Sequence, residues 1–233
     1  MIIIAIIFIA MAAAGFLFWA SASIRSGIYV KAFCRECTDR KTVYITFDDG
    51  PVRRSTSEVL DVLHARGARA TFFMIGANVT GNEDIVRRVI AEGHRVGIHS
   101  FSHASMFPLY STERMIKDIT ECRNVLERLA REDVTLFRPP FGVVNPTVAR
   151  AAGRCGLQTV GWSVRSFDTM HTDSSTWQQD TLDRIMRHLE PGAVILLHDR
   201  MPHAAGLLSA LLDRLASEGY RFDLPLPVPV HGE

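Results

Sequence analysis

The sequence predicts an α/β fold in which helices cover a parallel β-sheet. From Lys41 onward, short apolar runs alternate with amphipathic stretches, and the connections between them are short. Several of the apolar runs are followed directly by polar residues, at the strand ends where parallel sheets gather their functional sites. Six or seven strand–helix units are compatible with a closed barrel and with an open sheet, and the pattern does not choose between them.

The expected strands are the short apolar runs. Each is only a few residues long and is followed by a turn signal or by an amphipathic stretch. They cover residues 43–47, 70–75, 95–99, 135–137, 158–164 and 193–197, with 220–224 as a further candidate.

Start signals and apolar periodicity predict the helices. Ser55-Thr56-Ser57-Glu58 is a capping box that should open a helix through about Arg66. Asn145 followed by Pro146 has the pattern of an N-cap and a first helical residue. The longest helix is expected over residues 112–130 and should carry an apolar stripe at three- and four-residue steps. A further helix should begin at Asn82, and two more are expected over residues 176–189 and 203–218.

The composition is that of one globular domain with a short appendage. The chain has 233 residues, 47% of them hydrophobic and 22% charged, and a formal net charge of +1. No basic tract stands out, so no nucleic-acid partner is expected. Cys34 and Cys37 form a CxxC motif, but no second pair completes a zinc ribbon. We expect two incidental thiols, which an oxidising compartment would allow to pair.

The N-terminus is expected to be a membrane anchor. Residues 1–20 contain no charged side chain, and about 20 apolar residues suffice to span a bilayer. The small residues Ala20 and Ala22 also fit a signal-peptidase pattern, so secretion after cleavage near Ala22 is the alternative. The predicted boundaries are 1–22 for the signal-anchor or transmembrane helix, 23–40 for a linker, 41–225 for the main domain and 226–233 for an extended tail.

Two strand ends carry residues suited to a metal ion. Asp48 and Asp49 follow the first strand, and such neighbouring carboxylates repel unless a cation or hydrogen-bond donors stabilise them. His99 and His103 are four residues apart, which on a helical turn would place both imidazoles on one side. One carboxylate and two imidazoles suit a divalent ion with open coordination positions, as in catalytic sites. Taken singly, each motif also fits an ordinary acidic turn or a chance histidine pair.

Two further strand ends complete a recognisable combination. Residues 138–142 read Arg-Pro-Pro-Phe-Gly, and residues 196–198 read Leu-Leu-His. With Thr-Phe-Asp-Asp-Gly-Pro at 46–51 and His-Ser-x-x-His at 99–103, the chain resembles the polysaccharide deacetylases of carbohydrate esterase family four, which share the NodB homology domain. The resemblance covers roughly residues 41–224. It implies a distorted (β/α) barrel of about seven parallel strand–helix units, preceded here by the N-terminal apolar helix.

The resemblance implies three residues that carry the reaction. Asp48 resembles the general base that activates the attacking water. Arg138 resembles the residue that pairs with this base and orients it. His198 resembles the general acid that protonates the leaving amine.

The resemblance also implies the residues that hold the metal and the substrate. Asp49, His99 and His103 look like the metal triad, with Zn²⁺ as the expected ion and Co²⁺ or Ni²⁺ as alternatives. Phe141 matches the position whose backbone N–H helps to hold the oxyanion. Leu196 matches the apolar residue that lines the pocket for the acetyl methyl group.

One motif departs from the family pattern. Many members carry Asp-x-x-Asp-Trp after the strand near Val164, whereas this chain has Arg165 and Thr169 at the first and last of these positions. Asp168 remains and is expected among the residues around the substrate. Either Asp168 or Asp199 would have to compensate for the missing carboxylate in the network that sets the pKa of His198.

The expected function is that of a metal-dependent hydrolase that removes N-acetyl groups from a cell-envelope or extracellular polysaccharide and releases acetate. Arg25, Lys31 and Arg35 follow the apolar span, so the positive-inside tendency alone would place the domain in the cytoplasm. A polysaccharide substrate places it outside, in the periplasm or at the cell surface, and we adopt that orientation. The alternatives are a hydrolase of another non-peptide C–N amide on the same scaffold and a catalytically silent glycan-binding envelope protein.

Overall fold

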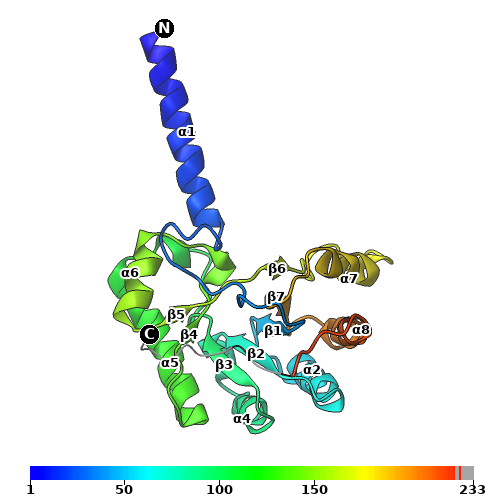
Figure 1. Cartoon of the computed structure of the whole chain (residues 1–233). Coiled ribbons are helices and arrows are strands. Elements are labelled where there is room, and N and C mark those ends of the chain that lie inside the picture. Colours follow the sequence, from blue (N-terminus) through cyan, green and yellow to red (C-terminus); the bar gives the residue numbers. More distant parts are fainter. Residues whose placement is uncertain (224–225, 227–233) are drawn as a thin grey trace.

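Seven parallel strands form one sheet in the order β5-β4-β3-β2-β1-β7-β6 (Figure 1). The computed structural model describes residues 1–223 and 226. The helices surround the sheet, as expected for a distorted (β/α) barrel that β5 and β6 leave open at its edges. The strands are β1 (Val43–Asp48), β2 (Ala70–Met74), β3 (Arg95–Ile98), β4 (Leu136–Phe137), β5 (Gln158–Thr159), β6 (Val164–Arg165) and β7 (Ala193–His198). The predicted α/β class and barrel are confirmed.

The helices follow the strands along the chain. The shortest ones, α3, η1 and η2, lie in the loops that lead away from strand ends. The helices are α1 (Ile2–Ala22), α2 (Arg53–Ala65), α3 (Gly76–Val79), α4 (Glu83–Ala91), η1 (Phe107–Leu109), α5 (Thr112–Ala130), η2 (Pro140–Gly142), α6 (Pro146–Arg154), α7 (Trp177–Arg187) and α8 (Ala204–Ser217).

Side chains at alternate positions of the central strands pack into two different apolar clusters. In β1, Val43, Ile45 and Phe47 belong to the large cluster that includes the inner faces of the helices. Tyr44 belongs instead to a smaller cluster, with Phe73 of β2, which fills the inside of the curved sheet. Because side chains alternate along a strand, one buried strand can supply both clusters. This arrangement fixes the strands whose ends carry the candidate site.

Two helix starts were predicted with different success. Asn145 caps α6 as expected, since its side chain accepts hydrogen bonds from the backbone N–H groups of Thr147 and Val148. The capping box at Ser55 is wrong, because α2 begins two residues earlier and no side chain caps it. Thr56 of that motif instead accepts a hydrogen bond from the Val52 N–H and donates one to Asp199.

The single strand predicted over residues 158–164 is also wrong. Its two ends form β5 and β6, which lie at opposite edges of the sheet. The middle of the segment crosses between these edges, and the backbone oxygens of Val160 and Gly161 accept hydrogen bonds from the buried Arg138 side chain. A continuous strand pairs along its length with the same neighbours, whereas here β5 pairs with β4 and β6 pairs with β7.

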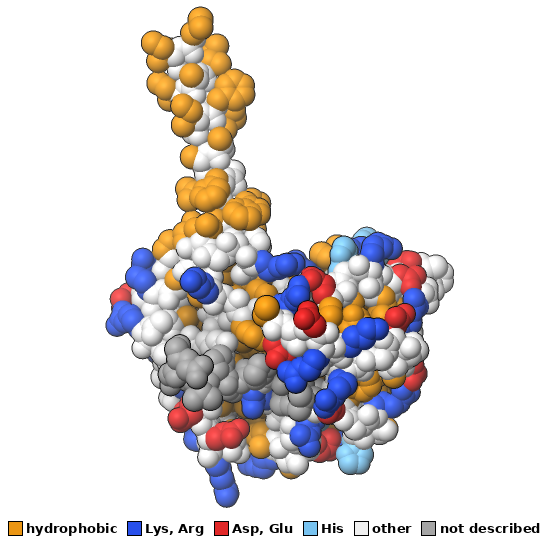
Figure 2. Space-filling view, in the orientation of Figure 1, with side chains coloured by type: hydrophobic (Ala, Val, Ile, Leu, Met, Phe, Trp, Pro, Cys, Tyr) orange, Lys and Arg blue, Asp and Glu red, His pale blue; other side chains and the backbone are white. Residues whose placement is uncertain are grey.

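The helix α1 projects from the domain with its apolar side chains exposed (Figures 1 and 2). It has 21 residues, and an 18-residue window within it has a mean hydropathy of 2.7, so by length and composition it could cross a membrane. Its last turn contacts the domain, since the Ser21 carbonyl accepts a hydrogen bond from the Val144 N–H. The segment 23–40 then pairs with the sheet through Phe33, opposite Val160, and Arg35, opposite Ala193. The domain boundaries given above remain predictions.

The C-terminal expectations fall partly outside the described residues. Within the candidate strand 220–224, Arg221 pairs with Thr42 as a single bridge, and residue 224 is not described. Of the expected tail 226–233, only Leu226 is described. Its side chain is buried in the smaller apolar cluster, with Tyr44 and Phe73.

Candidate active site

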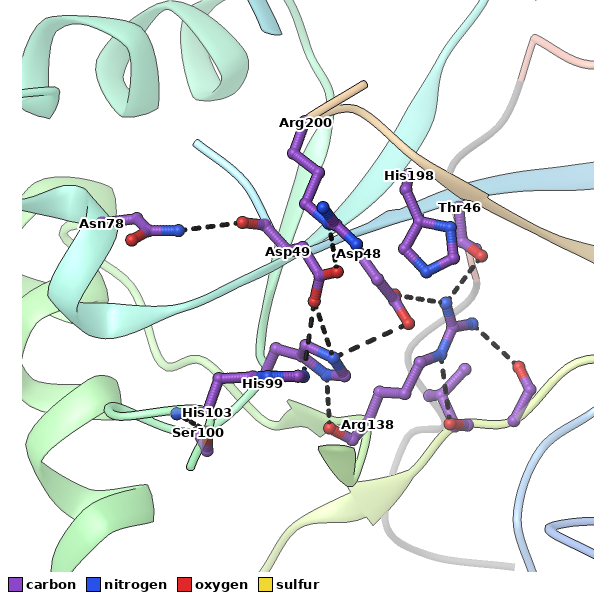
Figure 3. A network of polar contacts seen from close by, with 12 residues as sticks. Thr46, Asp48, Asp49, Asn78, His99, Ser100, His103, Arg138, His198 and Arg200 are labelled. Atoms are coloured by element: carbon purple, nitrogen blue, oxygen red, sulfur yellow. Dashed lines mark hydrogen bonds and ion pairs between the residues drawn. The ribbon is translucent and has the colours of Figure 1, made fainter. Parts of the chain in front are cut away.

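The carboxyl ends of the strands bring most of the predicted residues together, and Figure 3 shows six of them in one polar network: Asp48, Asp49, His99, His103, Arg138 and His198. Asp48 and His198 end the neighbouring strands β1 and β7 and are paired in register. The pocket wall combines residues of the strands β1, β6 and β7 with residues from the loops after β1, β3, β4, β5, β6 and β7. It comprises Asp48, Asp49, His99, His103, Phe141, Gly142, Trp162, Arg165, Phe167, Thr169, Leu196, His198 and Arg200.

Three of these residues are arranged as a metal-binding set. One ligand atom each from Asp49, His99 and His103 lies within 4.8 Å of the others. Oδ1 of Asp49 is 3.5 Å from Nε2 of His99 and 3.4 Å from Nε2 of His103. Ligand atoms around a tetrahedral Zn²⁺ with bonds of about 2.1 Å are about 3.4 Å apart. The donor set and its spacing therefore fit such an ion.

The backbone around the histidines differs from the helical turn that the sequence suggested. Ser100 and His103 have φ angles of 69° and 45°, so residues 99–103 form an irregular loop. The Ser100 hydroxyl accepts a hydrogen bond from the His103 N–H and holds this loop together. The two imidazoles still lie side by side, with ring centroids 4.9 Å apart.

Hydrogen bonds and charge prepare the three side chains as ligands. Nδ1 of His99 is 2.8 Å from the Arg138 carbonyl, so it carries the proton and leaves the Nε2 lone pair free. Burial, together with the charge of His99, lowers the pKa of His103, which favours its neutral, metal-binding form. Burial alone would raise the pKa of Asp49, but its contact with His99 and the positive charges of the surrounding histidines when they are protonated hold that pKa below its usual range.

Arg138 and Asp48 form a buried ion pair beside this set. Nη1 of Arg138 donates to Oδ1 of Asp48 at 2.7 Å and to the Thr46 hydroxyl at 2.9 Å. The guanidinium is fully buried, and Nη2 donates to the Gly161 carbonyl at 2.8 Å. A buried charge requires such a complete set of partners. The pair fixes Asp48 with Oδ2 on the side of His99, 3.8 Å from its Nε2.

Asp168 holds His198 from behind. Oδ1 of Asp168 is 2.8 Å from Nδ1 of His198, and Oδ2 accepts the His198 backbone N–H at 2.7 Å. Burial opposes a charged imidazole, but this hydrogen bond and the carboxylate charge raise the pKa of His198 above its usual value. Asp168 is buried and is not part of the pocket wall, so it would act on the substrate through His198, and its expected place among the residues around the substrate stays a prediction.

Asp199, the other candidate for compensation, contacts different groups. Its Oδ2 accepts a hydrogen bond from the Thr56 hydroxyl, and its carboxylate packs against Gly50. Burial raises the pKa of Asp199 to about 7. The carboxylate that supports His198 is therefore Asp168.

Sequence comparison identifies the family to which this site belongs. A sequence model described as polysaccharide deacetylase matches residues 35–160. A curated relative, a peptidoglycan-N-acetylglucosamine deacetylase of Bacillus cereus, is 36% identical over 195 residues, which span 79% of this chain and 86% of the relative. The chain belongs to the polysaccharide deacetylase family.

Solved structures similar to this deacetylase include two of contrasting kind. A family 4 acetyl xylan esterase from Clostridium thermocellum, in complex with a cobalt ion, matches with a TM-score of 0.72 and 30% identity over 79% of this chain and 88% of its own. A mutant of BA3943, described as a family pseudoenzyme with restored enzymatic activity, matches with a TM-score of 0.72 and 26% identity over 81% of this chain and 67% of its own.

The loop after β4 forms one wall of the deacetylase pocket. Phe141 has a φ of 62° and its half-exposed ring lies 4.8 Å from that of His103. Gly142 has a φ of 68°, and a Cβ there would lie 2.3 Å from the ring of Trp162. Leu196 of β7 is almost fully buried and also belongs to the pocket wall.

Sequence reasoning missed several residues of the site, including Phe167 in the pocket wall. Trp162 lines the pocket beside Gly142. Arg200 donates from Nε to Oδ2 of Asp49 at 2.8 Å, and Asn78 donates to the Asp49 carbonyl at 2.9 Å. Trp162 and Asn78 lie in segments that the sequence assigned to a strand and to a connection, so nothing local marked them. Arg200 comes directly after Leu-Leu-His-Asp at 196–199, and this closeness to His198 was the one sequence signal that could have placed it at the site.

Proposed function

We propose that this protein is a metal-dependent deacetylase that removes N-acetyl groups from N-acetylglucosamine-type units of an envelope polysaccharide and releases acetate. The observation that carries the proposal is the placement of Asp48 and His198 in the same pocket as the ligand set Asp49, His99 and His103. Family membership gives the class of reaction. The similar Bacillus cereus protein, named for peptidoglycan, supports an envelope glycan as the substrate class.

Asp48 acts as the general base. A divalent ion bound by the ligand set, Zn²⁺ with Co²⁺ or Ni²⁺ as alternatives, would supply Lewis acidity to the acetamide carbonyl and make a water molecule more acidic. Arg138 occupies Oδ1 of Asp48, so Oδ2 is the oxygen that takes the proton of the attacking water. The buried ion pair keeps this oxygen aimed at the pocket during the reaction.

His198 acts as the general acid. Asp168 engages Nδ1, which leaves Nε2 to carry the transferable proton. The raised pKa of His198 favours the imidazolium that this role requires. Transfer of that proton to the leaving nitrogen releases a free amino sugar as acetate forms.

The remaining roles concern the acetyl group itself. The Phe141 backbone N–H would donate to the oxyanion, and Leu196 would pack against the acetyl methyl group. The φ of 62° at Phe141 is a left-handed conformation that a bulky residue rarely adopts, as is common at functional loops. The buried apolar side chain of Leu196 beside His198 supports the methyl pocket.

The proposed location is outside the cytoplasm, with α1 as the membrane anchor. The exposed apolar surface of α1 and its length support an anchor, and the substrate class supports the orientation. Cleavage near Ala22 would instead release the domain. The mass of the protein recovered from the membranes and from the soluble fraction outside the cytoplasm distinguishes the two, because cleavage removes the first 22 residues.

The test of function is acetate release by the full-length protein from N-acetylglucosamine oligomers. Small N-acetyl amides are the comparison substrates that test for hydrolysis of other amides. Acetylated xylan is the one that tests for hydrolysis of esters. Release from the oligomers that stops on chelation and returns with Zn²⁺, Co²⁺ or Ni²⁺ is expected. Release from small amides alone would favour the other-amide alternative, and no release from any substrate would favour a silent glycan-binding protein. The similarity to a pseudoenzyme makes that last outcome a specific one to check.

A further inference from the structure

We propose that Arg165, Phe167 and Arg184 form a subsite that binds a carboxylate on the sugar next to the one being deacetylated. The inference rests on the proposed function, because it assigns a substrate feature to the same site. It concerns a second pocket, here called the side pocket, which shares Phe167 with the catalytic pocket. Its wall includes Ser166, Met170, Trp177, Thr181, Arg184 and Arg187.

Arg165 is free to contact substrate. It stands where the family pattern has a carboxylate, but Asp168 supports His198 instead. The Arg165 side chain is exposed and lines the catalytic pocket. Its guanidinium carbon lies 4.6 Å from the centroid of the Phe167 ring and 5.8 Å from that of Trp162.

Arg184 approaches the same ring from α7. Its guanidinium carbon is 5.0 Å from the Phe167 centroid. Packing on an aromatic ring restrains a guanidinium while leaving N–H groups for a planar anion, which a carboxylate matches with two parallel hydrogen bonds. Phe167 therefore positions two cations at the boundary between the two pockets.

Neither cation is neutralised by the protein. Within residues 1–223 and 226, no carboxylate oxygen lies within 4.0 Å of the Arg165 or Arg184 guanidinium nitrogens. The acidic residues of the side pocket have other partners. Asp183 pairs with Arg214 at 3.3 Å, and Asp180 accepts a hydrogen bond from the Thr176 hydroxyl at 2.7 Å.

The position of Arg165, Phe167 and Arg184, here called the cluster, determines which part of the substrate they can contact. Arg165 and Phe167 line the catalytic pocket, whereas Phe167 and Arg184 line the side pocket. A glycan whose acetyl group lies between Asp48 and His198 must therefore pass this cluster when it extends toward α7. Aromatic surface packs against the apolar face of a sugar ring, and two free cations select an acidic substituent on it.

The test compares binding of two N-acetylated oligomers that differ at one group. One carries a carboxylate on the unit adjacent to N-acetylglucosamine, and the other carries the carboxamide made from it. Binding is measured by calorimetry with full-length protein bearing Asp48→Asn, so that turnover does not interfere. The variants are Arg165→Gln and Arg184→Gln, with Arg87→Gln as the control, since Arg87 is an exposed arginine of α4 that lines neither pocket.

The acidic oligomer should bind about tenfold more tightly than the carboxamide, and each pocket variant should reduce that ratio to about threefold or less. Arg87→Gln should leave the ratio unchanged. An initial ratio near one, or equal weakening of both oligomers by the pocket variants, would overturn the subsite. Acetate release by the wild-type protein is assayed separately, so a silent protein that keeps the preference would refute the proposed function and not the subsite.

Discussion

Asp168 engages both the side chain and the backbone of His198, at 2.8 Å from Nδ1 and 2.7 Å from the backbone nitrogen. These contacts fix the ring orientation and the position of its mobile proton. They also compensate for Arg165, which replaces a carboxylate expected from the family pattern. The substitution therefore leaves the proposed acid supported and frees one arginine at the pocket.

Asp168→Asn should move the alkaline limb of the pH–rate profile to lower pH. The carboxylate raises the pKa of His198, and the imidazolium is lost as the pH rises through that pKa. Without the carboxylate, this loss occurs at lower pH. The measurement is kcat/KM for acetate release as a function of pH. Ser166→Ala is the control, because it removes one uncharged hydrogen-bond donor from Asp168 and keeps the carboxylate charge. An alkaline limb that does not move in Asp168→Asn would contradict this role.

Arg138→Met should destabilise the fold by about 3–5 kcal/mol, because it leaves the buried Asp48 carboxylate without its counter-charge. Adding Asp48→Asn should recover part of that loss by removing the charge. Recovery should be incomplete, since the Gly161 carbonyl also loses its donor. Urea denaturation of the two single variants and the double variant, in the presence of a chelator, measures the coupling. Strictly additive costs would mean that the ion pair does not exist as described.

Gly142→Ala should damage both stability and turnover. The left-handed backbone at this residue costs a non-glycine residue about 1–2 kcal/mol, and the new Cβ would displace the Trp162 ring. Gly153→Ala is the matched control, because it lies in α6 and has no neighbour within 4 Å of the added atom. That change should be neutral or stabilising by up to about 1 kcal/mol. Thermal unfolding and acetate release would count against this account if the two variants behaved alike.

Local sequence signals located the regular elements well. The apolar stripe predicted α5 with its observed limits, and the Asn145-Pro146 signal predicted the start of α6. The capping box failed because the Thr56 hydroxyl has a distant partner in Asp199, which no local pattern reveals. The segment 158–164 failed for a similar reason, since its first residues pair with β4 and its last residue pairs with β7, on opposite sides of the sheet.

The pocket was predictable as far as the resemblance reached. Every residue transferred from the motifs lies in the pocket wall or directly behind it. The sequence left Asp168 and Asp199 as alternatives for the support of His198, and the choice between them depends on the bend of the loop after β6, which no local pattern reveals. Trp162 and Arg200 were missed because each acts through a contact with a residue far away in the sequence.

The most direct test of the central claim measures bound metal and acetate release together in two variants. Asp48→Asn should retain about one equivalent of metal, like the wild type, and lose turnover by about 10²–10⁴-fold, because it removes a base and no ligand. His103→Ala should lose both the metal and the activity. If Asp48→Asn turned over at the wild-type rate, or if His103→Ala kept its metal and its activity, the proposed division between base and ligand set would be contradicted.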